Sequence, residues 1–286
     1  MTRHELGGRI REGRPVPPRY AAVADHVRSL IVAVQFLTRL PTPRVDLSDD
    51  VERRLTLGRA TAYFPLVGAL VGALTGATIL LAARFWPVGL AVVVGLAVEA
   101  VVTGAFHEDA VADFCDAFGG GWTREDVLRI LKDSRIGSFG ALGLGLAVAL
   151  RGGALASLET SQLLAALVAS ACLGRWAVLP AMSALPPLTD RESLSRDVGQ
   201  RIGLKRMALG TVMAVPGCVG FALVSPVRLA AAVAAVLALT LWLVRHVERR
   251  IGGMNGDSLG FLCYASQIAV LLSACASWRG TSGGLP

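Results

Sequence analysis

Five ionisable side chains arrive within ten residues, directly after an apolar stretch (residues 90–106) that carries a single charge: His107, Glu108, Asp109, Asp113 and Asp116. A helix that includes Asp109 would place the three aspartates on one face, because they stand at positions i, i+4 and i+7. Like charges on one face destabilise a helix unless a cation or a proton neutralises them. Carboxylate oxygens suit hard divalent cations, and Mg²⁺ above all when phosphate oxygens complete its coordination. The spacing therefore predicts a metal–phosphate site in which the three aspartates bind Mg²⁺.

His107 and the neighbouring residues have alternative interpretations. His107 is a metal ligand, a proton shuttle or a hydrogen-bonded structural histidine. The aspartates have the alternative of a solvated acidic helix start, which carboxylates favour. Surface charge of that kind is usually mixed with basic residues, yet no Lys or Arg occurs between Arg84 and Arg124. The triple glycine at 119–121 then permits either a sharp turn or the close approach of a ligand.

A second polar cluster, residues 131–140, directly precedes the next apolar stretch. Lys132, Ser134 and Arg135 are donors that suit phosphate oxygens, and an arginine binds them in bidentate fashion. Asp133 is either another metal ligand or the partner of Arg135. The alternative for the whole cluster is anchoring of the chain at the membrane surface by its basic residues.

A third cluster, residues 251–260, is a glycine-rich turn ahead of the last apolar stretch. Backbone amides in such a turn are able to bind an anion. Gly253, Gly256 and the lone carboxylate of Asp257 are therefore candidate substrate-binding residues. This third cluster can contribute to the same site only if it lies on the same side of the membrane as the aspartates.

Two arginines fall inside apolar stretches, where a charge needs a partner or a polar cavity. Arg175 is placed either to bind phosphate or to pair with Glu99, the only acidic residue of the stretch 86–106. Arg151 is expected near the outer end of its span, with its charged head reaching the interface. These expectations depend on which helices face each other.

The elements that must position these residues are apolar helices. The chain is 53% hydrophobic with a mean hydropathy of +0.58, and 17% of its residues are charged, against about a quarter in soluble proteins. The short stretch 27–41 suits an interfacial or re-entrant helix, and Gly68, Gly72 and Gly76 form a ridge that suits helix packing. We predict an all-α, polytopic membrane helix bundle with one catalytic domain over residues 27–280 behind a disordered cytoplasmic tail over 1–26. Its seven expected spans cover about 62–83, 86–106, 137–158, 162–184, 207–225, 228–245 and 258–277.

The basic residues are distributed unequally between the two ends of these spans. Of the 28 Lys and Arg residues, 23 lie before the first span or in the connections after the second, fourth and sixth spans. This bias places the N-terminus and all three polar clusters in the cytoplasm. The net charge of +7 then reports topology and contact with anionic lipid, and no nucleic-acid partner is expected. The five cysteines show no spacing typical of zinc binding or of a disulfide framework.

Taken together, the residues predict a polytopic membrane enzyme that acts on a phosphate ester. A phosphate group held by a metal ion, basic hydrogen-bond donors and a carboxylate base suit phosphoryl transfer. In that reaction positioning and electrostatic stabilisation provide most of the catalysis. One alternative is a phosphotransferase of the CDP-alcohol type, although the arginine of its D-G-x-x-A-R motif is missing here. Another is a divalent-cation transporter, which needs carboxylates in mid-membrane on several spans.

The ordered motifs resemble those of the adenosylcobinamide-GDP ribazoletransferase family, also called cobalamin synthase, over residues 30–277. The pattern H-x-D-G-x-x-D-x-x-D-G is matched by His107, Asp109, Asp113 and Asp116. The pattern D-S-R-x-G is matched by residues 133–137, and G-G-x-T-G-D-x-L-G is similar to residues 252–260. Residues 36–41 and 64–68 are likewise similar to family segments.

The resemblance implies the last assembly step of vitamin B12 at the bacterial cytoplasmic membrane. Adenosylcobinamide-GDP would react with α-ribazole, or its 5′-phosphate, to give adenosylcobalamin, or its phosphate, and GMP with the help of Mg²⁺. The aspartates would hold Mg²⁺ on the GDP moiety, and His107 or an aspartate would take the proton from the attacking hydroxyl. Arg135, Lys132 and Arg175 would offset the developing negative charge. The resemblance also leaves room for a homo-oligomer or a complex with other corrinoid-pathway enzymes.

The chain departs from the family pattern at several positions. Ala110 and Ala117 stand where the family usually has glycine, which predicts crowding of a closely approaching ligand. Asn255 replaces a threonine and keeps a polar side chain. Tyr264 and Gln267 align with positions that often carry glutamate in the family. If one of those glutamates binds a metal or acts in catalysis, this chain must work differently.

Overall fold

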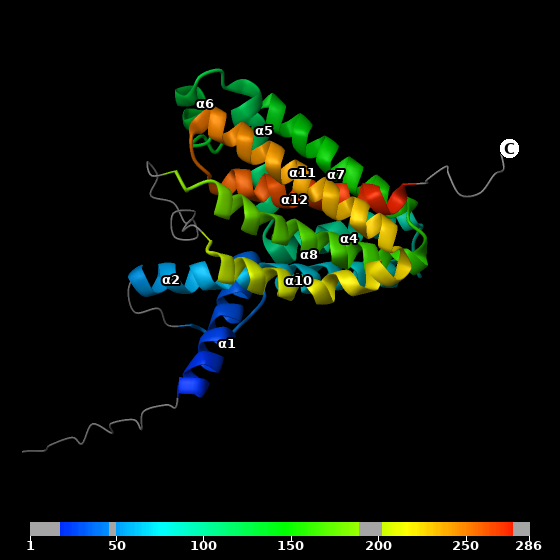
Figure 1. Cartoon of the computed structure of the whole chain (residues 1–286). Coiled ribbons are helices and arrows are strands. Elements are labelled where there is room, and N and C mark those ends of the chain that lie inside the picture. Colours follow the sequence, from blue (N-terminus) through cyan, green and yellow to red (C-terminus); the bar gives the residue numbers. More distant parts are fainter. Residues whose placement is uncertain (1–17, 46–49, 189–201, 277–286) are drawn as a thin grey trace, which may run out of the picture.

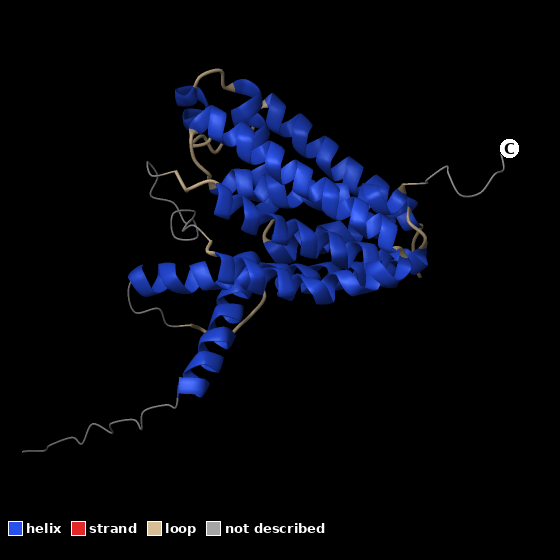
Figure 2. Ribbon diagram, in the orientation of Figure 1, coloured by secondary structure: helices blue, strands red, loops and turns tan. Residues whose placement is uncertain are grey.

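The computed structural model describes residues 18–45, 50–188 and 202–276, and within these ranges the elements are helical (Figure 2). The long ones are continuous apolar runs, while the short α6 begins at a capping box between Thr123 and Asp126. The helices are α1 (Pro18–Leu37), α2 (Asp50–Ala60), the 3₁₀ turn η1 (Thr61–Tyr63), α3 (Phe64–Ala82), α4 (Val88–Thr103), α5 (Phe106–Gly120), α6 (Arg124–Ile130), α7 (Ser138–Ser157), α8 (Thr160–Ala184), α10 (Leu204–Val224), α11 (Pro226–Ile251) and α12 (Gly256–Cys275).

Helices α3, α4, α7, α8, α10, α11 and α12 form one bundle with α8 at its centre, and α1 extends away from it (Figure 1). α8 packs against α3, α10, α11 and α12, and its apolar window is the most buried among the candidate spans. In the described part of the chain, six helices are long and apolar enough to cross a membrane, and a seventh crossing results if α4 and α5 count as one bent span. The protein is thus a multi-pass, all-α membrane protein, as predicted.

The predicted ridge of α3 is confirmed as a packing surface. A Cβ atom added to Gly68 would lie 2.3 Å from the carbonyl oxygen of Ala171, and one on Gly72 would lie 2.8 Å from that of Leu167. Both carbonyls belong to α8, and Gly76 faces the same helix. The small residues therefore let the α3 and α8 backbones approach closely, which is how helices cohere in lipid.

The second predicted span, residues 86–106, ends earlier than expected. α4 has 16 residues, or about 24 Å at 1.5 Å per residue, and the chain then bends by 91° into α5. The bend uses two consecutive left-handed residues, Gly104 with φ 71° and Ala105 with φ 55°. A Cβ on Gly104 would lie 2.3 Å from Nε of Arg39, so the bend is closed by a side chain from the α1–α2 connection. Hydropathy alone does not reveal such a bend, because both arms are apolar.

The N-terminal part contains more helix than the sequence indicated. α1 begins at Pro18, inside the segment predicted as a tail, while residues 1–17 lie outside the described residues. Residues 50–60 are polar, yet they form α2 and continue into α3. Hydropathy indicates where a chain meets lipid, and a helix is free to continue beyond that point into polar surroundings.

Candidate active site

α5 places the predicted aspartates and histidine on different sides of one helix. Asp109 is exposed and Asp113 and Asp116 are half-buried, while His107 is 4% exposed. Ala110, Val111 and Phe114 are buried with His107 and turn α5 toward the bundle. The helical spacing predicted for the three carboxylates is confirmed, and the structure separates them from His107.

Asp116 accepts hydrogen bonds from the start of α7. Its Oδ2 accepts from the backbone nitrogen of Gly137 and its Oδ1 from that of Gly140, each at 2.7 Å. A Cβ on either glycine would lie within 2.4 Å of an Asp116 oxygen, so the carboxylate needs both positions to lack a side chain. The first amides of a helix otherwise have no partner. Asp116 therefore brings the second polar cluster beside the first.

The basic residues of that second cluster lie in the exposed α6–α7 connection. Lys132, Ser134 and Arg135 are all exposed. Arg135 donates from Nη2 to Asp133 Oδ2 at 2.6 Å and from Nε to Oδ1 at 2.9 Å. These bonds lower the pKa of Asp133 to about 2. Of the two roles predicted for Asp133, the structure shows the pairing with Arg135.

The third cluster, the α11–α12 turn, also lies against α5. A Cβ on Gly260 would lie 2.4 Å from that of Ala110, and the rings of Phe114 and Phe261 stack with centroids 4.0 Å apart. The turn is held on its other side by an isolated bridge between Pro187 and Met254. All three clusters therefore meet around α5, although 21 and 144 residues separate Asp116 from Gly137 and Gly260.

The individual residues of this turn have different surroundings. Gly253 lies against Leu188, which gives it a packing role in the turn. Asn255 caps α12 by accepting from the backbone nitrogen of Ser258 at 3.3 Å, and its Nδ2 donates to Asp257 Oδ2 at 2.9 Å. Gly256 is the first residue of α12 and Asp257 stands in its first turn. The polar group that replaces the family threonine thus has a capping role of its own.

The two alanines that replace family glycines do not face a ligand. Ala110 is 5% exposed and packs against Gly260, and Ala117 is fully buried in the main apolar core. The predicted crowding of a ligand is therefore wrong. Their methyl groups fill helix–helix contacts, which the sequence alone did not place.

Long-range hydrogen bonds confirm that the clusters share one end of the bundle. Arg250 Nη2 donates to the carbonyl oxygen of Gly121 at 2.6 Å, and Arg124 Nε donates to that of Ile251 at 3.1 Å. They join the α5–α6 turn to the end of α11. Of the triple glycine, Gly119 and Gly120 are the last residues of α5, and Gly121 is its C-cap and lies against Val127.

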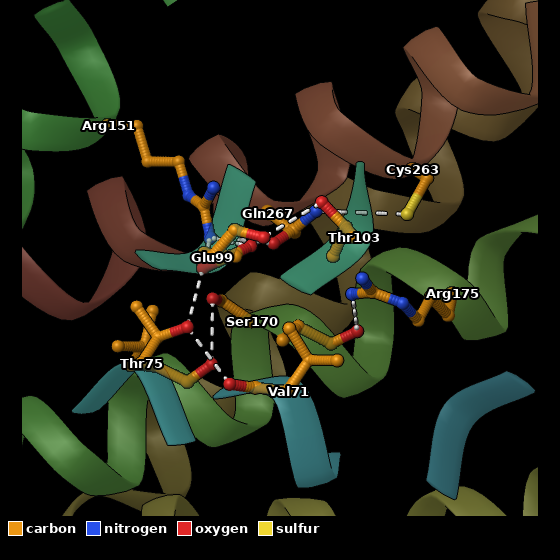
Figure 3. A network of polar contacts seen from close by, with 11 residues as sticks. Val71, Thr75, Glu99, Thr103, Arg151, Ser170, Arg175, Cys263 and Gln267 are labelled. Atoms are coloured by element: carbon orange, nitrogen blue, oxygen red, sulfur yellow. Dashed lines mark hydrogen bonds and ion pairs between the residues drawn. The ribbon is translucent and has the colours of Figure 1, made fainter. Parts of the chain in front are cut away.

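A buried ion pair lies deeper in the bundle, between α4 and α7 (Figure 3). Arg151 Nη2 donates to both carboxylate oxygens of Glu99 at 2.8 Å, and the two side chains are 1% and 3% exposed. Thr75 of α3 donates its hydroxyl to Glu99 Oε2 at 2.9 Å. The expectation that Arg151 snorkels outward is wrong, and of the two roles considered for Arg175 the pairing with Glu99 is set aside, because Glu99 pairs with Arg151. α7 turns Arg151 inward because Glu99 offers the opposite charge, and the sequence did not show that α4 and α7 face each other.

The two positions that often carry glutamate in the family lie beside this pair. Gln267 Oε1 accepts from Arg151 Nη2 at 3.0 Å, and the guanidinium carbon of Arg151 lies 5.1 Å from the centre of the Tyr264 ring. Both side chains are buried. An amide and an aromatic face thus adjoin Arg151, whose Nε has no hydrogen-bond partner among the described residues, while its negative partner comes from α4.

Arg175 presents an unpaired edge inside the bundle. Its side chain is 1% exposed, and Nη1 donates to the carbonyl oxygen of Ala171 at 3.1 Å. Nε and Nη2 have no hydrogen-bond partner in the described part of the protein. These two groups form the edge with which arginine binds carboxylate or phosphate in bidentate fashion. Gly68 leaves room for the stem, since a Cβ there would lie 2.7 Å from Arg175 Cδ.

Glu108 joins this interior cluster, although no role of its own was predicted for it. Its Oε2 is buried without a hydrogen-bond partner among the described residues. The charges of Arg151, Glu99 and Arg175 act on it, and both arginines also act on His107. One signal was available: Glu108 directly precedes Asp109, so on a helix its side chain points roughly 100° away from the face that the three aspartates share.

The donor set of α5 fits Mg²⁺ that arrives with phosphates. Within residues 18–45, 50–188 and 202–276, no three His, Cys, Asp or Glu side chains are grouped to hold a metal ion. Mg²⁺ is usually bound by one or two carboxylates together with substrate phosphates. Asp109 and Asp113 stand one helical turn apart, which is compatible with that mode, whereas both oxygens of Asp116 already accept backbone amides.

The comparison with known proteins covers nearly all of the described chain. The sequence pattern of the cobalamin-5-phosphate synthase family matches residues 29–275. The chain belongs to this family. Curated relatives in the family are named adenosylcobinamide-GDP ribazoletransferase. The relative from Ralstonia nicotianae is 37% identical over 88% of this chain and 96% of its own length, and that from Ralstonia pickettii is 38% identical over 88% and 95%. The relative from Shewanella frigidimarina is 37% identical over 85% of this chain and 94% of its own length. No solved structure matches the chain. Membership sets aside the CDP-alcohol and transporter alternatives.

Proposed function

We propose that α5, with the α6–α7 and α11–α12 connections, forms the active site of an adenosylcobinamide-GDP ribazoletransferase. The enzyme joins adenosylcobinamide-GDP to α-ribazole, or to its 5′-phosphate, and releases GMP in the final step of cobalamin synthesis. Membership of the family over residues 29–275 supports this activity. The observation that carries the location is the convergence on α5, where Asp116 holds Gly137 and Ala110 contacts Gly260.

Asp109 and Asp113 would hold Mg²⁺ in this proposal, and the ion would neutralise charge on the diphosphate. Asp116, the third predicted ligand, keeps α7 docked on α5 through its two amide contacts, and each oxygen retains a lone pair for the ion. Asp257 adds a carboxylate at the start of α12. Both helix starts lie against α5, so their amides and those of Gly253 and Gly256 are near the diphosphate.

Basic residues bind the remaining phosphate oxygens. The exposed Lys132, Ser134 and Arg135 reach the diphosphate from the α6–α7 connection. Arg175 approaches from inside the bundle, where its Nε and Nη2 lack a partner among the described residues. A buried unpaired guanidinium edge is unfavourable without an anion, and a phosphoryl oxygen pair would satisfy it.

His107 accepts the proton of the attacking hydroxyl. It is buried on a different side of α5 from Asp109 and Asp113, but His107 and Asp109 both stand in the first turn of α5, so the diphosphate would lie across this helix end with its phosphoryl group toward His107 and Arg175. The ribazole hydroxyl oxygen forms a bond to the cobinamide-linked phosphorus as the phosphoanhydride bond breaks and GMP leaves. The proton passes to the imidazole nitrogen, and the basic residues stabilise the charge on the leaving phosphate.

The site faces the cytoplasm of a bacterium in this proposal. The polar clusters and the start of α2 share the end of the bundle that carries most of the basic residues, which are retained on the inner side of the membrane. Substrates made in the cytoplasm would then reach α5 directly. Neither a homo-oligomer nor a complex with other corrinoid-pathway enzymes is needed to complete these contacts.

The decisive experiment measures GMP release from adenosylcobinamide-GDP and α-ribazole by the purified protein in lipid. We expect release that requires both substrates and Mg²⁺ and that His107→Gln slows without weakening the binding of adenosylcobinamide-GDP. Glu125→Gln on the exposed start of α6 serves as the matched control. GMP release without α-ribazole, or full activity of His107→Gln, would contradict the proposal.

A further inference from the structure

The outer face of α11 carries a hollow that the catalytic proposal does not use. It has a volume of about 370 Å³ and is lined by Ala238, Leu241, Trp242, Arg245, His246 and Arg249. All of these residues belong to α11. The hollow therefore opens on the side of α11 that faces away from α8 and α12.

The hollow combines two arginines with aromatic rings. Arg245 and Arg249 stand one helical turn apart and are both exposed. Trp242 stacks on His246 with ring centroids 5.3 Å apart and an angle of 15°. No acidic residue lines the hollow, and Arg250, the next basic residue, is engaged with Gly121. The hollow thus offers positive charge that no lining residue neutralises.

Its depth in the membrane matches the lipid headgroups. α11 has 26 residues and a length of about 39 Å, which exceeds a hydrocarbon core of about 30 Å. Leu237 and Leu241 are 40% and 56% exposed and continue the same face into the apolar part of the helix. Trp242 lies one turn before Arg245, where the apolar run of α11 ends, and tryptophan is enriched where such runs meet the headgroups. Arg245 follows about 5 Å further along the axis and Arg249 about 10 Å further.

We propose that this hollow binds the headgroup of an anionic phospholipid. The phosphate oxygens would accept hydrogen bonds from Arg245 and Arg249, and an acyl chain would lie along Leu241 and Leu237. Charge complementarity and the continuous apolar face select a lipid over a soluble anion, because a soluble anion gains nothing from the leucines. The site is independent of the roles proposed for α5.

The experiment uses the full chain, delipidated in detergent, and follows Tm as phosphatidylglycerol is added. Phosphatidylcholine is the neutral lipid control and glycerol phosphate the soluble control. We expect a saturable rise of Tm with phosphatidylglycerol alone. In R245Q/R249Q, half-saturation should need roughly 30-fold more lipid, because each arginine near an anionic surface contributes about 1 kcal/mol. R84Q/R129Q removes the same charge from exposed positions elsewhere and should behave as wild type.

Three outcomes would overturn the proposal. An unchanged titration of R245Q/R249Q excludes the site, and an equal loss in R84Q/R129Q replaces it with general surface electrostatics. A rise of Tm with glycerol phosphate makes the occupant a soluble phosphate ester.

If R245Q/R249Q does not fold, quenching by lipids brominated on the acyl chain tests wild type against W242F. Stronger quenching of Trp242 by phosphatidylglycerol than by phosphatidylcholine supports the site, and equal quenching excludes it.

Discussion

Asp109 and Asp113 of α5 and Glu99 of α4 stand close in the sequence and have opposite surroundings. Asp109 and Asp113 are exposed or half-buried at one end of the bundle, where solvent and ligands reach them. Glu99 is 3% exposed and is bound by Arg151 and Thr75. Carboxylates in an apolar chain thus have two roles. Those at the end of the bundle are available to a ligand, and one in the interior is paired with a basic residue of a neighbouring helix.

Arg151 and Arg175 repeat this contrast among the buried bases. Both are 1% exposed, yet Arg151 has a carboxylate and an amide as acceptors, whereas Arg175 contacts one backbone carbonyl. A paired buried charge holds helices together, and an unpaired buried edge is stable only with a ligand or water. We therefore expect substitutions of paired interior charges to lower stability, and substitutions of Arg175 and the exposed carboxylates to lower activity.

The largest effect is expected from breaking the interior ion pair. Arg151→Met leaves Glu99 buried without its partner and should lower the free energy of unfolding by about 3–5 kcal/mol. Equilibrium unfolding in mixed micelles measures this change. In Glu99→Leu/Arg151→Met the loss should largely disappear, because no buried charge remains. Equal instability of the single and double variants would show that the pair does not couple α4 to α7.

Asp113 tests the rim carboxylates. Asp113→Asn should lower Mg²⁺-dependent GMP release by about 100- to 1,000-fold, as expected when one electrostatic contact to a transferring phosphoryl group is lost. Its free energy of unfolding should change far less than in Arg151→Met. The steady-state rate over a range of Mg²⁺ concentrations, with Glu125→Gln as control, measures the effect. Near wild-type turnover of Asp113→Asn would refute the proposed metal site.

Arg175 should behave unlike Arg151. Arg175→Met removes an unpaired buried charge, so the free energy of unfolding should stay level or rise. The catalytic efficiency should fall about 10- to 150-fold, which corresponds to about 1.5–3 kcal/mol for a charged hydrogen bond. Arg175→Lys should not restore it, because an ammonium group lacks the two-pronged edge. A destabilised Arg175→Met with normal kinetics would assign Arg175 a structural role.

The contact between Asp116 and α7 gives the smallest expected effect and has a matched control on the same helix. Gly140→Ala would place a Cβ 2.2 Å from Asp116 Oδ2, and we expect a loss of about 1–3 kcal/mol of stability with lower activity. Gly145→Ala has no neighbour within 4 Å and should stabilise α7 by up to about 1 kcal/mol. Thermal unfolding of both variants makes the comparison. Equal behaviour would mean that Asp116 does not hold α7.

The sequence predicted the elements and the candidate motifs better than it predicted their contacts. Long apolar runs without charge require helices in lipid, so the all-α bundle and the approximate spans followed from hydropathy. The spacing of Asp109, Asp113 and Asp116 indicated a shared helical face. The polarity of residues 50–60 was misleading, because α2 is helical without being apolar.

The sequence did not reveal which residues pair with the buried charges. Arg151 and Arg175 differ little in local sequence, and both lie in apolar helices. Which of them meets Glu99 depends on the packing of α4 against α7, over a sequence separation of 52 residues. The alanines at 110 and 117 were misread for a similar reason, since the side of α5 that packs on α12 was unknown.

The sequence by itself determined that the chain forms apolar helices, that basic residues gather at one end of them, and that the candidate ligand-binding residues stand in three short polar clusters. These properties depend on composition and on spacing within single helices. Only the tertiary structure decided that the clusters meet on α5, that Asp116 holds α7, and that Arg151 is paired while Arg175 is not. Such contacts join residues far apart in the chain, and helix packing, which no local pattern encodes, brings them together.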